Sequence, residues 1–488
     1  MKEGLIMEII KGIPLQTFQR TPYVKMSGPP MPEGDEGPGG PGGPGGPGGP
    51  GGPEGMPPMP ENKPEFAALE IVDGKVAAHD EAMTGSITDT EARDLKLNSG
   101  RGDLGGVYVA NSEYTVEHAN IRLSGEGQGL GGKLSGAAVE DHGKLTLKDC
   151  RIDMTGKLRC ATSAGGNSVL KVYDSLLVSH GDPWNVDEKE VTWIIGPGMA
   201  KPPVFLEIEG NMRTHCTVMD SESYFYNSTV IADSWAALST DAAGDRVYLE
   251  ANDCKVITTR SGYGTYADTG CYCTLNRCDL DVANMAAIVA GESGVQLNDC
   301  TAKCGSYVVL NHVVGGGPMA DALLSQVSDI RIRGGKYQCE NEAVVVKSNN
   351  ADVLFENAEI RSFAGLLLRS KLNDDPCAPD PAGKKVYGIH VTLRDMTADS
   401  GIAHEDPNRV MTVKLEKSVL NGPITGGALV TLDGESKWTA TADSDVVLNG
   451  DAPAGAIDAL PGVTITARGG EETEIVLPSG GKLIVHAN

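Results

Sequence analysis

The chain has 488 residues, of which 40% are hydrophobic, 5% are aromatic and 63 are glycine. Its 41 basic and 66 acidic residues give a net charge of −25, which argues against nucleic acid as a partner because a phosphate backbone needs a basic surface. No apolar run is long enough to span a bilayer, so a membrane is not an expected partner either.

The first 65 residues differ in composition from the rest of the chain. Residues 1–27 form an N-terminal segment, and residues 28–65 form a linker rich in Pro and Gly, with Gly at every third position of its centre. A collagen triple helix is one interpretation of that period, whereas the second Gly of each triplet favours a flexible linker. Glu3 and Glu8 interrupt what would be the apolar part of a secretory signal, so we expect a cytoplasmic protein.

Residues 66–488 carry a repeat of short strands with alternating apolar residues. Each unit ends in a polar corner and a small or thiol residue, and the units that close at Cys254, Cys278 and Cys300 are 24 and 22 residues apart. That spacing holds three short strands and three turns, which is one coil of a right-handed parallel β-helix. The sequence therefore predicts an all-β domain, a single-stranded right-handed parallel β-helix over residues 66–488. The same cadence recurs at residues 145–150, 170–175, 330–335, 353–358, 391–396 and 413–418.

The eleven cysteines fall mostly at the closing positions of these units. Residues that close successive coils would stack about 4.8 Å apart along the axis, the spacing of neighbouring strands. Because the number of cysteines is odd and the positions are those of a packed row, we expect reduced, buried thiols and not a disulfide framework.

The repeat is interrupted most strongly between His180 and Asp268, where aromatic and titratable residues concentrate. Insertions into a solenoid often carry binding chemistry, because the stacked strands hold them in place. A Tyr beside an Arg and a His is suited to proton transfer, since Arg favours the phenolate and His titrates near neutral pH. The alternative is that these are ordinary strand and turn residues. The expected catalytic residues are Tyr263, Tyr266 and His215, with Arg260 as a charge stabiliser and Asp241 and Asp268 as orienting groups.

Further residues of the same region are expected to bind a ring-shaped ligand. Trp184, Trp193 and Trp235 would form apolar walls, Tyr224 would add an aromatic contact, and Arg213 would hold an anionic group. The arginines at positions 213, 246, 260 and 277 are also the local concentration of positive charge that an anionic substrate would need in so acidic a protein.

From about Val107 onward, the coils resemble the right-handed parallel β-helix, pectate-lyase-like superfamily, and residues 428–440 are similar to the repeats of adhesin-like β-helix proteins. The resemblance implies the fold, but its members include lyases, polygalacturonases, epimerases, methylesterases and surface proteins. Residues 263–268 match the start of the Tyr-Gly stretch of the epimerases and lack its Pro-His. The paired aspartates and downstream signatures of polygalacturonases are absent.

The expected function is that of an intracellular lyase, epimerase or isomerase. It would abstract a proton from a sugar acid or another small cyclic, even aromatic, substrate, and the protein would form a homo-oligomer. Two alternatives remain, a non-catalytic adhesin-like binding scaffold and a glycoside hydrolase.

No cofactor and no metal ligands are expected at the site itself. Acids in predicted insertion loops form the exception, because carboxylates there could hold Ca²⁺. These acids are Asp374, Asp375, Asp380, Glu405 and Asp406.

Overall fold

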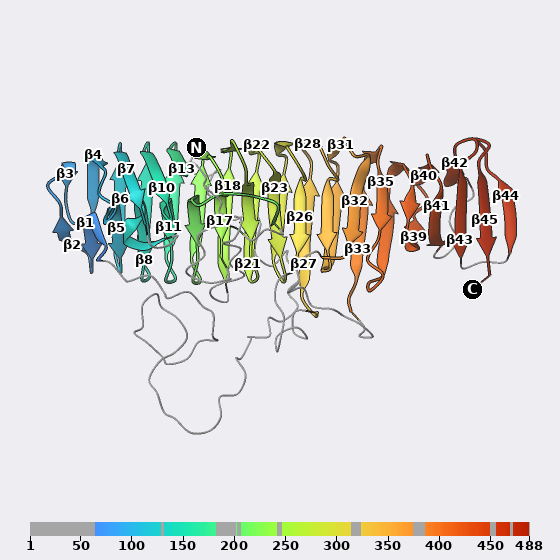
Figure 1. Cartoon of the computed structure of the whole chain (residues 1–488), viewed down its shortest axis with the longest axis horizontal. Coiled ribbons are helices and arrows are strands. Elements are labelled where there is room, and N and C mark those ends of the chain that lie inside the picture. The colour runs from blue at the N-terminus through green and yellow to red at the C-terminus, as the bar shows by residue number, and fades with distance from the viewer. Residues whose placement is uncertain are drawn as a thin grey trace, which may run out of the picture. The chain divides into compact units, whose positions relative to one another are not determined.

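The computed structural model describes residues 64–127, 131–181, 202, 206–241, 246–313, 324–373, 386–448, 455–468 and 472–487. Chain contacts divide the protein into a unit of residues 1–32 and a unit of residues 33–488, and every described residue lies in the second unit. These residues form a long stack of short parallel strands (Figure 1), which confirms the predicted parallel β-helix. Between β7 and β33 each strand pairs with strands three elements away along the chain, so three strands make one coil.

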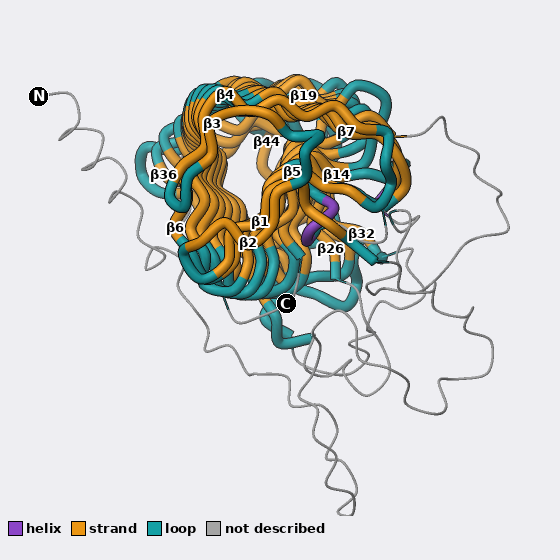
Figure 2. The backbone as a smooth tube through the Cα atoms, turned by 90° about the vertical axis from the view of Figure 1, so that its left-hand side faces the viewer, coloured by secondary structure: helices purple, strands orange, loops and turns teal. Residues whose placement is uncertain are grey.

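Figure 2 looks along the stack and shows the strands surrounding the interior. The first face is a 14-stranded sheet, and the second and third faces belong to a 27-stranded sheet that is continued on the third face by a sheet of four strands. The first face contains β2 (Lys75–His79), β1 (Phe66–Val72), β5 (Leu104–Ala110), β8 (Ala137–Glu140), β11 (Cys160–Ala164), β14 (Arg213–Thr217), β17 (Ala236–Thr240), β20 (Tyr263–Ala267), β23 (Met285–Ala290), β26 (Val309–His312), β29 (Val344–Lys347), β32 (Leu366–Lys371), β35 (Gly401–His404) and β38 (Ile424–Thr425).

Along most of the chain, a strand of the first face is followed by one strand of the second face and then by one strand of the third face. The second face contains β6 (Glu113–Glu117), β9 (Lys144–Lys148), β12 (Val169–Tyr173), β15 (Glu222–Tyr226), β18 (Val247–Asn252), β21 (Cys271–Asn276), β24 (Gly294–Asn298), β27 (Val327–Arg333), β30 (Asn350–Glu356), β33 (Ile389–Arg394), β36 (Met411–Glu416), β39 (Ala428–Leu432), β41 (Ser444–Leu448), β43 (Thr464–Arg468) and β45 (Lys482–His486). The third face contains β7 (Asn120–Glu126), β10 (Arg151–Lys157), β13 (Leu176–Gly181), β16 (Thr229–Ala232), β19 (Lys255–Thr258), β22 (Asp279–Val282), β25 (Thr301–Cys304), β28 (Lys336–Cys339), β31 (Glu359–Ser362), β34 (Thr397–Ala398), β37 (Val419–Asn421), β40 (Lys437–Ala440) and β42 (Ile457–Ala459).

The two ends of the stack carry antiparallel pairs. At one end β1 pairs with β2, and β3 (Thr84–Ile87) pairs with β4 (Glu91–Ser99), which contributes to both the second and third faces. At the other end β44 (Thr473–Val476) pairs with β45. A 3₁₀ helix, η2 (Gly132–Leu134), precedes β8.

The corner between the second and third faces explains why each repeat unit ends as it does. Its turning residue has a positive φ, 49° at Asp149 and 54° at Asp253, a conformation that Asp and Asn tolerate better than most residues. The next residue then points inward. Cys278 and Cys300 occupy this position, where each Sγ donates to a carbonyl of the preceding coil, at 3.4 and 3.3 Å. The ten cysteines within the described ranges are buried and free, as expected for reduced thiols. Only Cys150, Cys254, Cys278 and Cys300 close a coil at this corner, and the other six lie within strands, so the thiols do not form a single row.

Just before this corner, the last outward-facing residues of the second face form one row along the stack. Register pairs each member with its counterpart one coil away, and within successive stretches of the row similar or complementary side chains are neighbours. We call this row the corner ladder. Its pairs are Glu117 with Lys148, the stacked rings of Tyr173 and Tyr226, the amides of Asn252, Asn276 and Asn298, and the ion pairs that link Arg333, Glu356, Arg394 and Glu416.

The first face differs from the other two because both of its sides are buried over several coils. All residues of β11, β14 and β17 are buried. On the outer side, Leu206 and Ile208 pack with Trp235 and Met285 in an apolar cluster separate from the interior core. A covered outer surface on a solenoid wall allows polar groups to be held away from water, and the candidate site lies here.

Candidate functional site

The outer surface of the first face brings together most of the residues that the sequence predicted. His215, Leu238 and Thr265 are register partners whose row faces the interior, since Leu238 belongs to the interior core. The next row is Cys216, Ser239 and Tyr266, and it faces outward. The residues gathered on this surface, which we call the first-face cluster, are Arg213, Trp235, Ser239, Asp241, Tyr263, Tyr266 and Asp268.

An ion pair between Arg213 and Asp241 forms the base of the cluster. The guanidinium donates to Asp241 Oδ2 at 2.6 Å and to Ser239 Oγ at 3.3 Å, and it lies over the Trp235 ring at 4.5 Å. The Arg213 side chain is 4% exposed and that of Asp241 is 35% exposed. Burial is the largest single influence and acts to lower the pKa of Arg213, but the Asp241 carboxylate together with Tyr263 and Cys216 holds that pKa well above its ordinary value. A charged, buried arginine therefore fixes the orientation of a carboxylate that solvent can reach.

Two phenols lie beside this ion pair. Tyr263 is buried, with its hydroxyl 2.9 Å from Ser239 Oγ, and its ring centroid is 5.6 Å from that of Tyr266. Burial is the main cause that raises the pKa of both phenols, while Arg213 opposes the rise at Tyr263 and the Asp268 charge adds to it at Tyr266. Both groups therefore keep their protons at neutral pH. They can donate hydrogen bonds or protons, and neither can act as a base there.

A second carboxylate lies one coil from the first. Ser239 pairs with Tyr266, and extending this register by two residues places Asp268 next to Asp241 on the adjacent coil, with strands about 4.8 Å apart. Asp268 is partly exposed and accepts a hydrogen bond from the Tyr266 hydroxyl at 3.2 Å. The accessible part of the cluster thus consists of two carboxylates and one protonated phenol, above a buried layer of Arg213, Ser239 and Tyr263.

Three of the predicted residues lie elsewhere. His215 points into the interior, where its ring contacts Thr162 Oγ1 at 2.9 Å, Thr217 Oγ1 at 2.7 Å and the edge of Phe225. Burial lowers its pKa to about 3, so the ring is neutral at physiological pH. Because it lies on the opposite side of β14 from the phenols, it cannot exchange a proton with a substrate bound to the cluster.

Arg260 and Tyr224 also lie apart from the first-face cluster. Arg260 is 48% exposed and pairs with Asp233 at 2.8 Å. Tyr224 is on the second face, where its hydroxyl donates to Glu222 at 2.7 Å. Neither residue contacts the group that contains Asp241.

The three tryptophans predicted as walls have different outcomes. Trp184 and Trp193 lie outside the described residues. Trp235 is buried and has a φ of 66°, with Gly210 and Gly262 closely packed on either side of it. Its ring packs against the buried guanidinium of Arg213, so Trp235 stabilises the cluster from inside the protein and does not form an exposed wall of the site.

The predicted concentration of positive charge is neutralised by neighbouring acids. Each of the four arginines has its own carboxylate partner, so together they provide no excess charge for an anion. The pairs are Arg213 with Asp241, Arg246 with Glu222, Arg260 with Asp233 and Arg277 with Asp253.

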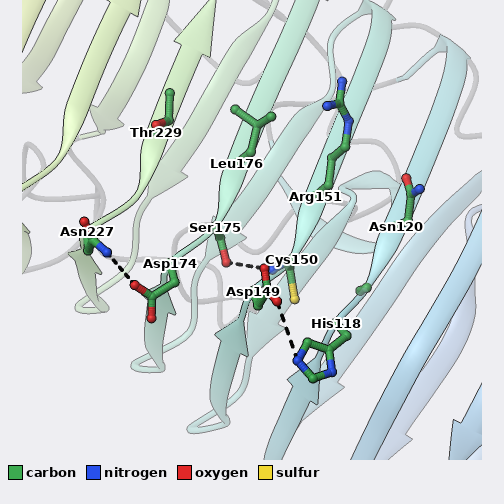
Figure 3. A pocket seen from close by; sticks show the side chains of 11 residues that line it. His118, Asn120, Asp149, Cys150, Arg151, Asp174, Ser175, Leu176, Asn227 and Thr229 are labelled. Carbon is green, nitrogen blue, oxygen red and sulfur yellow. Dashed lines mark hydrogen bonds and ion pairs between the residues drawn. The ribbon is translucent and has the colours of Figure 1, made fainter.

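A shallow groove of about 400 Å³ runs along the corner between the second and third faces (Figure 3). His118 lies 3.5 Å from Asp149 there, and Asn227 donates to Asp174 at 2.6 Å. The side chains of His118 and Asp149 are 55% and 73% exposed. These are the turning residues that the corner requires coil after coil, so the groove follows from their stacking. The first face, with its buried polar groups, is the better candidate for function.

No model of a known protein family and no curated protein sequence matches this chain. The assignment of the site therefore depends on the structure itself. Within the described part of the chain, no helix has the length and apolar character that crossing a membrane requires.

The acids considered as Ca²⁺ ligands are either outside the described residues or paired. Asp374, Asp375 and Asp380 lie outside them. Glu405 binds Arg369 at 2.8 Å, and Asp406 forms a buried pair with Arg409 at 2.8 Å. Across the described ranges, no group of three or more His, Cys, Asp or Glu side chains is placed to hold a metal ion.

Two residues near the cluster were not predicted to take part. Ser239 bridges Arg213 and Tyr263, and its distance of 24 residues from Tyr263, one coil, was a signal that could have identified it. His312 stacks on Tyr266, although it lies 46 residues further along the chain (312 − 266). Two coils separate it from Tyr266, and no short motif marks such a distance.

Proposed function

We propose that this protein is an enzyme, a lyase, epimerase or isomerase, that abstracts a proton from a small cyclic substrate bound at the first-face cluster. The observation that carries the proposal is the accessible carboxylate of Asp241, fixed from below by a buried arginine and placed beside a protonated phenol. A base held in one orientation next to an acid is the arrangement that general acid–base catalysis requires.

Each accessible group has a role in this proposal. Asp241 accepts the proton from a substrate carbon, and Tyr266 donates a hydrogen bond or its proton to the substrate oxygen on which negative charge develops. Asp268 orients the Tyr266 hydroxyl by accepting its hydrogen bond at 3.2 Å, and this single O–H turns from Asp268 to the substrate oxygen when substrate binds. In an epimerase or isomerase the proton returns to carbon, whereas in a lyase a leaving group departs instead.

The charges around the site bear on the class of substrate. Asp241 and Asp268 carry two negative charges against the single positive charge of Arg213, and the nearby arginines are already paired. A neutral ring, such as an uncharged sugar or a cyclic ketone, fits this balance better than a sugar acid does, because a second anion would be repelled.

The test is exchange of substrate hydrogen with solvent. Neutral and acidic sugars and cyclic ketones are incubated with the protein in D₂O, and mass spectrometry measures uptake of deuterium, which reports proton abstraction even where no net conversion occurs. Asp241→Asn and Tyr266→Phe should each lower the exchange rate about 10²- to 10⁴-fold, the usual contribution of a general acid or base. The matched control is Asp253→Asn, which removes another aspartate paired with an arginine, 2.8 Å from Arg277 and away from the site, and should leave the rate unchanged. Exchange that survives both site substitutions would refute the proposal.

Glycoside hydrolysis is a second candidate, favoured by one observation, the position of Asp241 and Asp268 at matching places on adjacent coils. Strands about 4.8 Å apart place two carboxyl groups near the separation of about 5 Å found in retaining glycosidases. New reducing ends on oligosaccharides would identify this reaction. In that case Asp268→Asn would be as damaging as Asp241→Asn, whereas for proton abstraction its effect would be smaller, since Asp268 then acts only through Tyr266.

A further inference from the structure

His312 is a buried histidine on the outer side of the first face. It ends β26 and is 1% exposed. The register runs from Ala267 to Val289 and from Ala290 to His312, so Asp268, Ala290 and His312 occupy one row. Two strand spacings, about 10 Å, therefore separate the backbone of His312 from that of Asp268.

The ring of His312 is stacked on that of Tyr266. Their centroids are 6.3 Å apart and their planes differ by 16°, while Tyr263 contacts Tyr266 at an angle of 54°. Tyr266 is thus held by one ring from its own coil and by another from two coils away. A phenol at a partly open surface needs such contacts to keep one orientation, because each free torsion would lower the fraction of time its hydroxyl is aligned.

The surroundings of His312 suit a neutral ring that supports its neighbour. Burial, reinforced by the charge of Lys347, lowers its pKa to about 3. Lys347 follows His312 in the same row and is held by Glu207 at 2.8 Å, which anchors residues 206–208 over the outer surface. The imidazole therefore remains uncharged at neutral pH.

We infer that His312 is a positioning residue for the candidate site, stacking on Tyr266 so that the Tyr266 ring keeps one orientation, with its hydroxyl within reach of Asp268 and of the substrate. This inference rests on the proposed function, in which Tyr266 is the acid. It adds a residue from a distant coil whose contribution is the flat face of its ring and not its titration.

The experiment combines a structural signal with kinetics. The full chain is labelled with 3-fluorotyrosine, and the ¹⁹F resonance of Tyr266, one of 13 tyrosines, is assigned by its loss in Tyr266→Phe. His312→Ala should shift or broaden that resonance, and His312→Phe, which keeps a flat ring, should restore a single sharp signal. His390→Ala is the matched control, because His390 packs against Tyr387 at 4.5 Å on another face and should leave the Tyr266 signal unchanged.

The kinetic arm uses any substrate that shows exchange. His312→Ala should lower kcat about 10- to 100-fold, the cost of a misplaced catalytic group, with KM changed less than about threefold, and His312→Phe should recover most of kcat. An unmoved Tyr266 resonance in His312→Ala, or a His312→Phe variant as slow as His312→Ala, would overturn the inference. If Asp241→Asn and Tyr266→Phe leave exchange intact, the proposed function fails, while the NMR arm still decides whether His312 positions Tyr266.

Discussion

His215 provides a quantitative prediction about acid stability. Its pKa is about 3 in the folded protein, because the ring is buried, compared with about 6.5 in an unfolded chain. Below about pH 6.5 the unfolded state therefore binds a proton that the folded state does not, so stability is complete above that pH and is lost as the pH falls toward 3. At about pH 4.5, about two pH units below the pKa in the unfolded chain, the loss amounts to about 2.7 kcal/mol, and it reaches about 4 kcal/mol near pH 3.

The assay compares urea unfolding of the natural protein and His215→Gln at about pH 7 and at about pH 4.5. Carboxylates contribute to acid unfolding in both proteins, so the difference between their losses of stability isolates the histidine. We expect His215→Gln to lose about 2.7 kcal/mol less than the natural protein does over this interval. The matched control is His118→Gln, which replaces a side chain that is 55% exposed and should follow the natural protein. Equal acid sensitivity of His215→Gln and the natural protein would refute the burial of a neutral imidazole.

Two further predictions concern packing. Gly262→Ala should destabilise the fold by about 2 kcal/mol or more in urea unfolding, because Gly262 has a φ of 122° and an added Cβ would lie 2.4 Å from the Trp235 carbonyl oxygen. Gly434→Ala, where an added Cβ meets nothing within 4 Å, should leave stability nearly unchanged, and equal effects at the two sites would contradict the described backbone. The native protein should also react with a thiol reagent at no more than one of its eleven cysteines, since the ten described ones are buried; rapid reaction of several thiols without denaturant would contradict that burial.

The fold could be predicted from the sequence because its signals are local and repeated. The return of a closing residue after 24 and then 22 residues, at Cys254, Cys278 and Cys300, reports the coil length directly. Asp253 and Asp299, which precede Cys254 and Cys300, mark left-handed corners that Asp accepts more readily than most residues, whereas Arg277 takes the same conformation before Cys278 without such a signal. A solenoid contacts mainly its neighbouring coils, so local spacing contains most of the information about the architecture.

The site was harder to predict because it depends on which side of a strand each residue faces. Spacing by one coil correctly brings Asp241 near Tyr263 and Tyr266. The same argument places His215 near Asp241, yet the side chain of His215 enters the interior while that of its neighbour Cys216 faces outward. Successive side chains of a strand point to opposite sides of the sheet, so a shift of one residue along the strand reverses the direction. The coil spacing alone does not determine which residues of a strand point into the interior.

His312 was missed because it acts across two coils. From Ala267 to Val289 and from Ala290 to His312 each coil has 22 residues, so the spacing is regular, but comparison of residues one coil apart does not reach a contact two coils away. Beyond His312 the spacing itself fails, since the coil from His312 to Lys347 has 35 residues. The place of Lys347 in this row becomes visible only when the strands are paired in space.

The corner ladder also bears on how many coils this protein needs. Asn252, Asn276 and Asn298 follow one another at distances of 24 and 22 residues, each bonded to the next through its amide. If the middle coil were excised, Asn252 would meet Asn298 and the same amide bond would form across the join. In the ionic part of the ladder, excision of the coil that supplies Glu356 would instead place Arg333 against Arg394. In this row of contacts, the amide stretch therefore matches after removal or addition of single coils, whereas the stretch of alternating charges matches only when coils are removed or added in twos.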